Sequence, residues 1–93
     1  MTRPRIEIKY CTRCKFLLRA AWVAQELLAT FEDKIAEVVL VPSTGGIFEI
    51  RLDGDLLFSN KQTAGFPEAK DIKRLVRDRI APGMRIGHEN SQP

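Results

Sequence analysis

The sequence predicts an α/β fold in which two helices pack on one mixed, four-stranded sheet, in the order strand, helix, strand, strand, strand, helix. Three observations predict it. A short alternating strand pattern precedes a long helical one, a β-branched run follows that helix, and a hairpin signal precedes the last helical pattern. A strand, a crossover helix and a second strand form a βαβ unit with parallel strands. A chain of 93 residues has the length of one domain, so we expect a single domain over residues 1–93.

The composition is typical of a soluble globular protein, with 44% hydrophobic and 29% charged residues. The sequence has no apolar run long enough for a membrane span, and its first five residues lack the apolar core of an export signal. We therefore expect a cytoplasmic protein without membrane contact. The net charge of +3 is modest, and acidic residues interrupt the basic residues of the last helix, so nucleic acid is not an expected partner.

The first two elements are a strand and a long helix. Residues 5–10 alternate charged and apolar side chains, which places the apolar ones on a single face of a strand. The next pattern is helical from about Thr12 to Phe31. Its expected apolar stripe consists of Leu17, Ala20, Ala21, Ala24, Leu27, Leu28 and Phe31. Trp22 falls on the opposite side, where it either lies over long neighbouring side chains or docks a partner protein.

The next three strands complete the sheet. Residues 35–41 form a β-branched run too apolar to alternate, as expected of a strand covered on both faces. Residues 47–52 and 56–58 flank Asp53-Gly54-Asp55, which is a strong hairpin signal. These segments predict the second, third and fourth strands.

The last helix is expected from Pro67, a residue suited to a first helical turn, to about residue 80. Its apolar face would consist of Ala69, Ile72, Leu75, Val76 and Ile80. We expect a loose tail from about residue 83, because the remaining residues have little to bury. His88 in that tail is the only further good zinc ligand, so we expect no metal and no other cofactor.

The loop after the second strand decides the order of the strands. The carboxyl ends of parallel strands lie at the same edge of a sheet. Residues 42–46 leave the second strand at that edge. Five extended residues reach about 16 Å, whereas the step from the second strand over the first to the third spans two strand spacings, roughly 10 Å. The loop is therefore long enough to cross the first strand. The predicted order is therefore 2-1-3-4, a reduced thioredoxin-like sheet.

Cys11 and Cys14, the only cysteines in the chain, lie between the first strand and the helix. A C-x-x-C at such a position is typical of a thioredoxin-like redox motif. The start of the helix would favour a thiolate at Cys11, and Arg13 and Lys15 would tune its pKa by adding positive charge. Cys14 is close enough to form a disulfide that resolves a mixed intermediate. The loop at residues 42–46 should lie beside the pair.

Substrate docking is expected at this loop, because Gly45 and Gly46 let a substrate chain approach the backbone. Thr44 and Phe48 flank the two glycines and complete the expected docking segment.

Several segments resemble the selenoprotein W, T and H family of redox proteins, the Rdx family. The shared segments are Tyr10-Cys11-x-x-Cys14, Thr44-Gly45-Gly46-x-Phe48-Glu49-Ile50 and Gly54-x-Leu56. Those similar to its bacterial cysteine-containing branch are Arg19-Ala20-Ala21-Trp22, Ala24-Gln25-Glu26-Leu27-Leu28 and Gly65-Phe66-Pro67. The resemblance covers residues 5 to about 88.

The resemblance implies a thioredoxin-like fold and a redox role for Cys11 and Cys14 in cell redox homeostasis. Family members with selenium carry selenocysteine at the position of Cys14, whereas the position at the helix start favours Cys11. We expect Cys11 to be the exposed, attacking thiol. Sulfur in place of selenium implies a weaker peroxidase activity. The cis-proline of ordinary thioredoxins is absent at residues 44–46, so substrate docking would differ from theirs.

Two functions are open at this point. A thiol–disulfide oxidoreductase would cycle between dithiol and disulfide, act on protein thiols, glutathione or peroxide, and depend on a reductase. A non-enzymatic redox-sensing interaction module would use the cysteine pair as a sensor and bind a partner through Trp22 or the loop after Pro42. An exposed Trp22 would also favour a weak homodimer.

Overall fold

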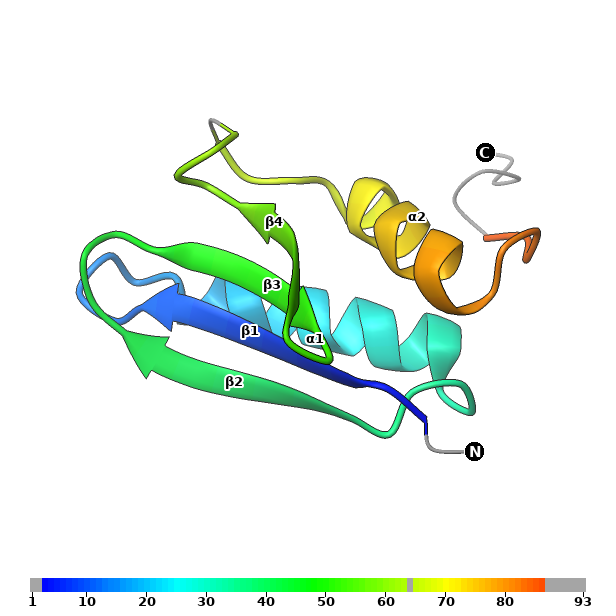
Figure 1. Ribbon diagram of the computed structural model, residues 1–93. Coiled ribbons are helices and arrows are strands. Elements are labelled where there is room, and N and C mark those ends of the chain that lie inside the picture. Colours follow the sequence, from blue (N-terminus) through cyan, green and yellow to red (C-terminus); the bar gives the residue numbers. More distant parts are fainter. Residues whose placement is uncertain (1–2, 64, 87–93) are drawn as a thin grey trace, which may run out of the picture.

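Four strands and two helices follow one another in the predicted order (Figure 1). The computed structural model describes residues 3–63 and 65–86. The elements are β1 (Arg5–Cys11), α1 (Leu17–Phe31), β2 (Glu37–Ser43), β3 (Phe48–Leu52), β4 (Asp55–Ser59) and α2 (Ala69–Ile80). The α/β class is therefore confirmed.

The four strands form one mixed sheet in the order β2-β1-β3-β4, which confirms the predicted order. β1 pairs in parallel with β2 and antiparallel with β3, and β3 and β4 form the hairpin. The chain leaves β2 and crosses the end of β1 to enter β3 (Figure 1). This crossing brings the β2–β3 loop to the end of β1 that carries the cysteines.

Both helices cover the same face of the sheet. α1 packs against β1 and β2, and α2 packs against β4 and α1. Ile6, Ile8 and Ile50 are fully buried, because alternation along the strands points them toward the helices. Ile72 and Val76 of α2 belong to the same core. One hydrophobic core therefore holds the sheet and both helices together.

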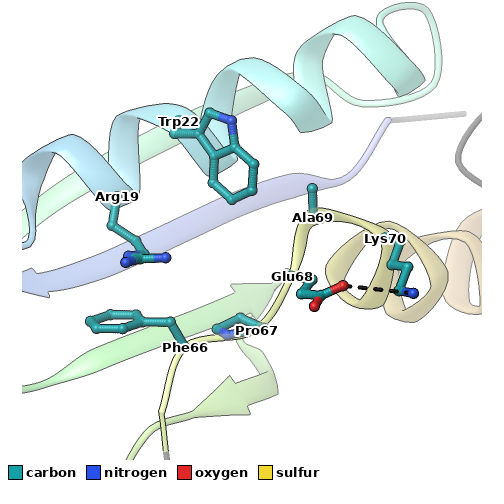
Figure 2. A pocket seen from close by; sticks show the side chains of 7 residues that line it. All are labelled: Arg19, Trp22, Phe66, Pro67, Glu68, Ala69 and Lys70. Atoms are coloured by element: carbon teal, nitrogen blue, oxygen red, sulfur yellow. Dashed lines mark ion pairs between the residues drawn. The ribbon is translucent and has the colours of Figure 1, made fainter.

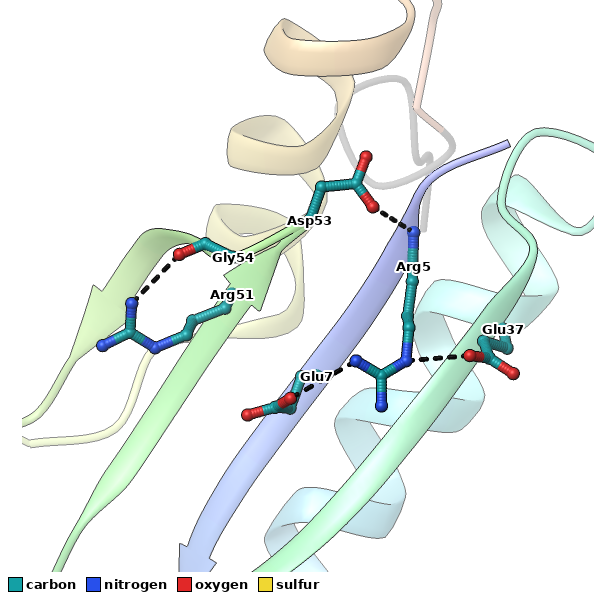
Figure 3. Close-up of polar contacts among 6 residues, drawn as sticks. All are labelled: Arg5, Glu7, Glu37, Arg51, Asp53 and Gly54. Carbon is teal, nitrogen blue, oxygen red and sulfur yellow. Dashed lines mark hydrogen bonds and ion pairs between the residues drawn. The ribbon is translucent and has the colours of Figure 1, made fainter. Parts of the chain in front are cut away.

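The other face of the sheet carries charged side chains. In Figure 3, Nε of Arg5 lies 2.8 Å from Oε2 of Glu37, and its Nη1 lies 3.5 Å from Oε1 of Glu7. The backbone N–H of Arg5 donates to Oδ1 of Asp53 at 2.9 Å, which ties the start of β1 to the β3–β4 turn. Exposed ion pairs contribute about 0–1 kcal/mol each. These contacts of Arg5 lie at the start of β1, the end of the strand opposite Cys11.

The strand predicted at residues 35–41 differs from its expectation. β2 begins at Glu37 and is an edge strand, with Val38 to Val41 only half-buried. The prediction that both faces of this strand are covered is therefore wrong. Val38 and Leu40 pack on the core, so one face alone needs the apolar side chains, and β-branched residues also suit the exposed face of a strand.

Helix α1 buries a stripe slightly rotated from the predicted one. Leu17 and Leu28 are 49% and 43% exposed, whereas Val23 is 1% exposed. In α2, Leu75 is exposed and Lys73 is buried instead. The Lys73 ammonium lies 2.8 Å from Oε1 of Glu26, so this ion pair joins the two helices. The apolar period identified both helices but left the centre of each buried stripe uncertain by one position.

The expected loose tail is wrong for its first residues. Ile86 is 1% exposed, and Met84 packs against the core. The rest of that tail, residues 87–93 with His88, lies outside the described residues. Within residues 3–63 and 65–86, no helix is long and apolar enough to cross a membrane.

Candidate functional site

Cys11 ends β1 and Cys14 lies in the turn that follows, so neither is at the start of the helix as predicted. α1 begins at Leu17, and residues 12–16 form successive turns. The N–H of Lys15 donates to the carbonyl of Thr12 at 3.2 Å, and Lys15 has a φ of +59°. A residue in the left-handed region cannot continue an α-helix, so the helical pattern is interrupted there. Cys11 therefore lies six residues before the first residue of α1 and not in its first turn.

The β2–β3 loop lies against this turn, as the strand order predicted. The N–H of Cys11 donates to the carbonyl of Ile47 at 2.8 Å, and the N–H of Thr12 donates to the carbonyl of Ser43 at 3.1 Å. Gly45 and Gly46 adopt φ values of +77° and +71°, which L-amino acids with a side chain rarely adopt. The predicted juxtaposition of loop and cysteines is confirmed.

The two sulfurs are in contact and differ in exposure. The Cys14 thiol donates a hydrogen bond to the sulfur of Cys11 at 2.7 Å, and both cysteines are free. Cys11 is the last residue of β1 and is 2% exposed, whereas Cys14 is exposed. The expectation that Cys11 is the exposed thiol is therefore wrong. β1 extends one residue further than expected, to Cys11, and the β2–β3 loop covers this residue.

Their hydrogen bond shifts the two thiols in opposite directions. The bond from Cys14 lowers the pKa of Cys11, against the effect of desolvation, and backbone N–H groups of Gly46, Cys14 and Arg13 lower it further. The same bond raises the pKa of Cys14, and desolvation and the nearby Cys11 sulfur add to this. Lys61 and the backbone of Gly46 act in the opposite direction on Cys14. The first negative charge of the pair therefore resides on Cys11, with the proton on Cys14.

A turn after β4, to which the sequence analysis assigned no role, positions the β2–β3 loop. Asn60 Nδ2 donates to the carbonyl of Gly46 at 2.7 Å, and its Oδ1 accepts from the N–H of Phe48 at 2.9 Å. The Lys61 ammonium donates to the carbonyl of Gly45 at 2.7 Å. A Cβ built on Gly46 would lie 3.8 Å from Lys61 Nζ and 4.0 Å from Cys14 Sγ. Asn60 and Lys61 thus belong to the site, and only tertiary structure reveals them.

Phe48, which the sequence placed among substrate-docking residues, lies beneath the site. It is fully buried. Its ring contacts Phe16, Phe58 and Phe66 edge-on, with ring centroids 5.2 to 6.4 Å apart. Such buried aromatic pairs stabilise a core and do not present a surface to a substrate. Phe48 therefore supports the loop from the core side.

The other expected site residues lie on the surface around the cysteines. Thr44 and Gly45 are exposed, in the loop beside the pair. Arg13 and Lys15 are exposed in the turn itself. Their roles in docking and in tuning the thiols stay predictions.

Trp22 lies at a surface groove between α1 and the start of α2. It is 42% exposed. The groove has a volume of about 340 Å³, and Figure 2 shows Trp22 and Arg19 on one side of it and Phe66 and Pro67 on the other. The guanidinium of Arg19 lies 4.3 Å from the centre of the Phe66 ring, a cation–π distance. Trp22 therefore has a surface on which a partner could bind.

Chemically, this arrangement provides an exposed thiol, a buried thiol in contact with it and backbone N–H groups that stabilise negative charge on sulfur. A thiolate is the species that attacks disulfides. Among the described residues, no cluster of three or more His, Cys, Asp or Glu side chains has the arrangement of a metal site.

The sequence of the chain matches one protein family, and solved structures share its fold. The model of the Rdx family matches residues 5–78. A solved protein of Bordetella parapertussis has a TM-score of 0.82 and 55% identity, over 84% of this chain and 99% of that one. A selenoprotein W-related protein from Vibrio cholerae has a TM-score of 0.82 and 50% identity, over 84% of this chain and 98% of that one.

Curated relatives are more distant. A protein named migration and invasion enhancer 1 from Bos taurus is 32% identical over 75 residues, which is 78% of this chain and 62% of the relative. Its Mus musculus counterpart is 31% identical over 74 residues, 77% of this chain and 61% of the relative. The match thus spans less than two thirds of the length of these relatives.

Proposed function

The chain belongs to the Rdx family, and from this premise we propose that it is a thiol–disulfide redox protein that works through Cys11 and Cys14. The observation that carries the proposal is the 2.7 Å contact between an exposed Cys14 thiol and a buried Cys11 sulfur. Such a pair supplies an accessible sulfur for attack and a second sulfur already within reach of it. This is the arrangement that two-step disulfide exchange requires.

In the first step, the sulfur of Cys14 attacks one sulfur of a substrate disulfide. A bond forms between Cys14 and that sulfur, the substrate S–S bond breaks, and the second substrate sulfur leaves as a thiolate. As Cys14 attacks, its proton passes to Cys11 across their hydrogen bond. In the second step Cys11, after losing that proton to the departed thiolate, attacks the sulfur of Cys14. The Cys11–Cys14 disulfide forms, the remaining substrate sulfur leaves, and two electrons have passed to the substrate.

Exposure supports Cys14 as the attacking sulfur, in place of the Cys11 expected from the sequence. Attack on a disulfide needs a nearly linear approach of three sulfurs, and Cys11, 2% exposed, has no free surface for it. The lowered pKa of Cys11 fits the second role, because the resolving sulfur must become a thiolate inside the mixed disulfide. The family position of selenium, which corresponds to Cys14, agrees with this order.

Trapping with single-cysteine variants tests this proposal. Cys11→Ser should retain a mixed disulfide with a substrate on Cys14, because no second sulfur resolves it. Cys14→Ser should trap at least tenfold less, because the remaining thiol is buried. Intact mass spectrometry after reaction with oxidised glutathione measures both adducts. Equal or greater trapping by Cys14→Ser would contradict the proposed order, and absence of any adduct in both variants would contradict the redox function.

Regeneration needs a second reaction partner. A dithiol reductase, or two glutathione molecules, would reduce the Cys11–Cys14 disulfide and return two electrons and two protons. Protein disulfides and oxidised glutathione are the substrates that the exposed thiol fits, and a reducing cytoplasm would supply the reductant. Peroxide would oxidise Cys14 to a sulfenic acid that Cys11 then condenses with, releasing water.

A redox-sensing interaction module is the second candidate, and the exposed apolar residues near the site support it. Leu18 is 83% exposed, and Trp22 and Phe66 line the adjoining groove. In this function, oxidation of the pair would alter the binding of a partner without repeated turnover. Steady-state turnover of a disulfide substrate with a reductase would favour the first function, whereas one oxidation per molecule would favour the second.

A further inference from the structure

Three segments next to the cysteines carry only positively charged side chains, although a glutamate follows each of them directly, at positions 26, 49 and 68. They meet at this end of the molecule and are the turn and first helical turns at residues 12–25, the β2–β3 loop at 42–48, and residues 59–63 and 65–67 after β4. None of these segments contains an aspartate or a glutamate. Their charged residues are Arg13, Lys15, Arg19 and Lys61, here called the cationic rim.

All four members of the cationic rim are exposed. Within residues 3–63 and 65–86, no member of the rim forms an ion pair. Arg19 stacks on Phe66, and Lys61 donates to the carbonyl of Gly45, so both are held in place by uncharged groups.

Most cations elsewhere on the described part of the molecule lie next to carboxylates, although Arg3 and Lys9 form no ion pair there. Arg5 pairs with Glu37 at 2.8 Å and Arg79 with Asp55 at 2.6 Å. The modest net charge of +3 therefore conceals a concentration of positive charge around Cys14. A local field of one sign near a reactive group attracts ligands of the opposite sign.

We propose that the cationic rim selects disulfide substrates whose cysteines are flanked by aspartate or glutamate, that is, acidic segments of partner proteins. This inference rests on the proposed function and adds its substrate class. Carboxylates beside a substrate disulfide would meet Arg13, Lys15 and Lys61 as that disulfide approaches Cys14. The exchange itself is unchanged: two electrons pass from the dithiol of the protein to the substrate disulfide.

The cationic rim should act mainly on the rate at which the protein and an acidic substrate meet. Steering by a charged surface raises association rates by about 10- to 1,000-fold at low ionic strength, and salt removes much of this gain because the screening length falls to about 10 Å at 0.1 M. Four separated cations with an aromatic groove to one side are also too sparse to track the phosphates of a nucleic acid. An acidic peptide segment, with a few carboxylates near one disulfide, matches their number.

Three peptides with one identical disulfide loop test this proposal. Two aspartates, two serines or two lysines would flank the loop on each side. The fully reduced protein reacts with each peptide in a single turnover, and acid quenching with mass spectrometry gives the rate. Each rate is divided by that of dithiothreitol with the same peptide, which removes differences in the reactivity of the peptide itself. The acidic peptide should react at least tenfold faster than the lysine peptide at low salt, and less than threefold faster at 0.5 M salt.

Two charge reversals of equal size give the matched comparison. Arg13→Glu alters the rim, whereas Lys34→Glu alters an exposed cation in the α1–β2 connection, at the far end of α1. Arg13→Glu should lower the ratio of acidic to neutral peptide rates at least threefold, and Lys34→Glu should change it less than twofold. Because each variant is compared with itself on the neutral peptide, a change in thiol reactivity cancels.

Several outcomes would overturn the inference. Equal rates for the three peptides would remove the substrate class while leaving the redox function intact, as would an equal loss in Lys34→Glu. Tighter binding of a double-stranded oligonucleotide than of the acidic peptide, with no charge preference in the exchange rates, would assign the rim to nucleic acid. If none of the peptides is reduced, the proposed function itself fails, and the inference fails with it.

Discussion

Three neighbours set the chemistry of the Cys14 sulfur: the Cys11 thiol, the backbone of Gly46 and the ammonium of Lys61. The first raises the pKa of Cys14, and the other two lower it. The pKa of Cys11 is shifted in the other direction: it is lowered, chiefly by the hydrogen bond that Cys11 accepts from Cys14. One of the two groups that lower the pKa of Cys14 is thus a lysine that lies 47 positions away in the sequence and reaches the β2–β3 loop from the turn after β4.

Replacement of Lys61 by methionine should raise the pKa of Cys14, since the variant loses the positive charge that lowers it. At neutral pH a higher pKa means less thiolate, so alkylation of Cys14 by iodoacetamide should slow severalfold. The midpoint of the rate against pH should move to higher pH. Measurement in the Cys11→Ser background assigns the rate to one sulfur.

Lys61→Arg is the matched control, because it keeps the charge and should restore most of the rate. An unchanged pH midpoint in Lys61→Met would show that the ammonium does not act on the sulfur. A parallel Lys15→Met variant tests the tuning role predicted for Lys15.

Single residues also mark where sequence reasoning reached its limit. The spacing of Cys11 and Cys14 and the position of the crossing loop were predictable, because strand polarity alone determines which ends meet. The start of α1 was not, because Lys15 has a positive φ that no glycine or asparagine signalled. The exposure of the two sulfurs followed from that turn, and so it too was missed.

Between elements, the two helices meet through a buried charge. The side chain of Lys73 is 7% exposed and that of Glu26 is 32% exposed. The sequence did not single out Lys73 among the basic residues of the last helix, since periodicity alone does not show which lysine faces a neighbouring helix. A buried ammonium needs a charged partner more than a half-exposed carboxylate does, because water still reaches the carboxylate.

This asymmetry predicts unequal costs for two substitutions. Glu26→Gln removes the carboxylate charge that lies 2.8 Å from the buried Lys73 ammonium and should lower the free energy of unfolding by about 2 kcal/mol. Lys73→Met keeps the apolar stem, leaves the carboxylate partly hydrated and should cost less than about 1 kcal/mol. Urea denaturation, analysed with one common m value for all variants, measures both changes in the free energy of unfolding. A larger loss in Lys73→Met than in Glu26→Gln would contradict this account of the pair.

For the molecule as a whole, the strand order places every part of the site at one edge of the sheet. The βαβ unit, the hairpin and the crossing loop were predictable because chain reach and handedness leave few arrangements. The coverage of β2 was not, since a β-branched run suits a buried strand and a half-exposed edge strand alike. The groove beside Trp22 needed the packing of α1 against the segment before α2, which only tertiary structure provides.

At the same scale, the position of the pair favours the proposed redox cycle over a permanent structural disulfide. The crossing loop covers Cys11 and leaves Cys14 open, so a disulfide between them would stay accessible to a reductant. Structural disulfides have reduction potentials below about −300 mV, whereas accessible catalytic ones lie higher.

Equilibration of the protein in glutathione redox buffers, with the Cys11–Cys14 disulfide quantified by mass spectrometry after alkylation, tests the proposed redox role most directly. The geometry predicts a two-electron transition between dithiol and intramolecular disulfide with a midpoint above about −300 mV. A midpoint well below that value, or oxidation that yields no bond between Cys11 and Cys14, would contradict it.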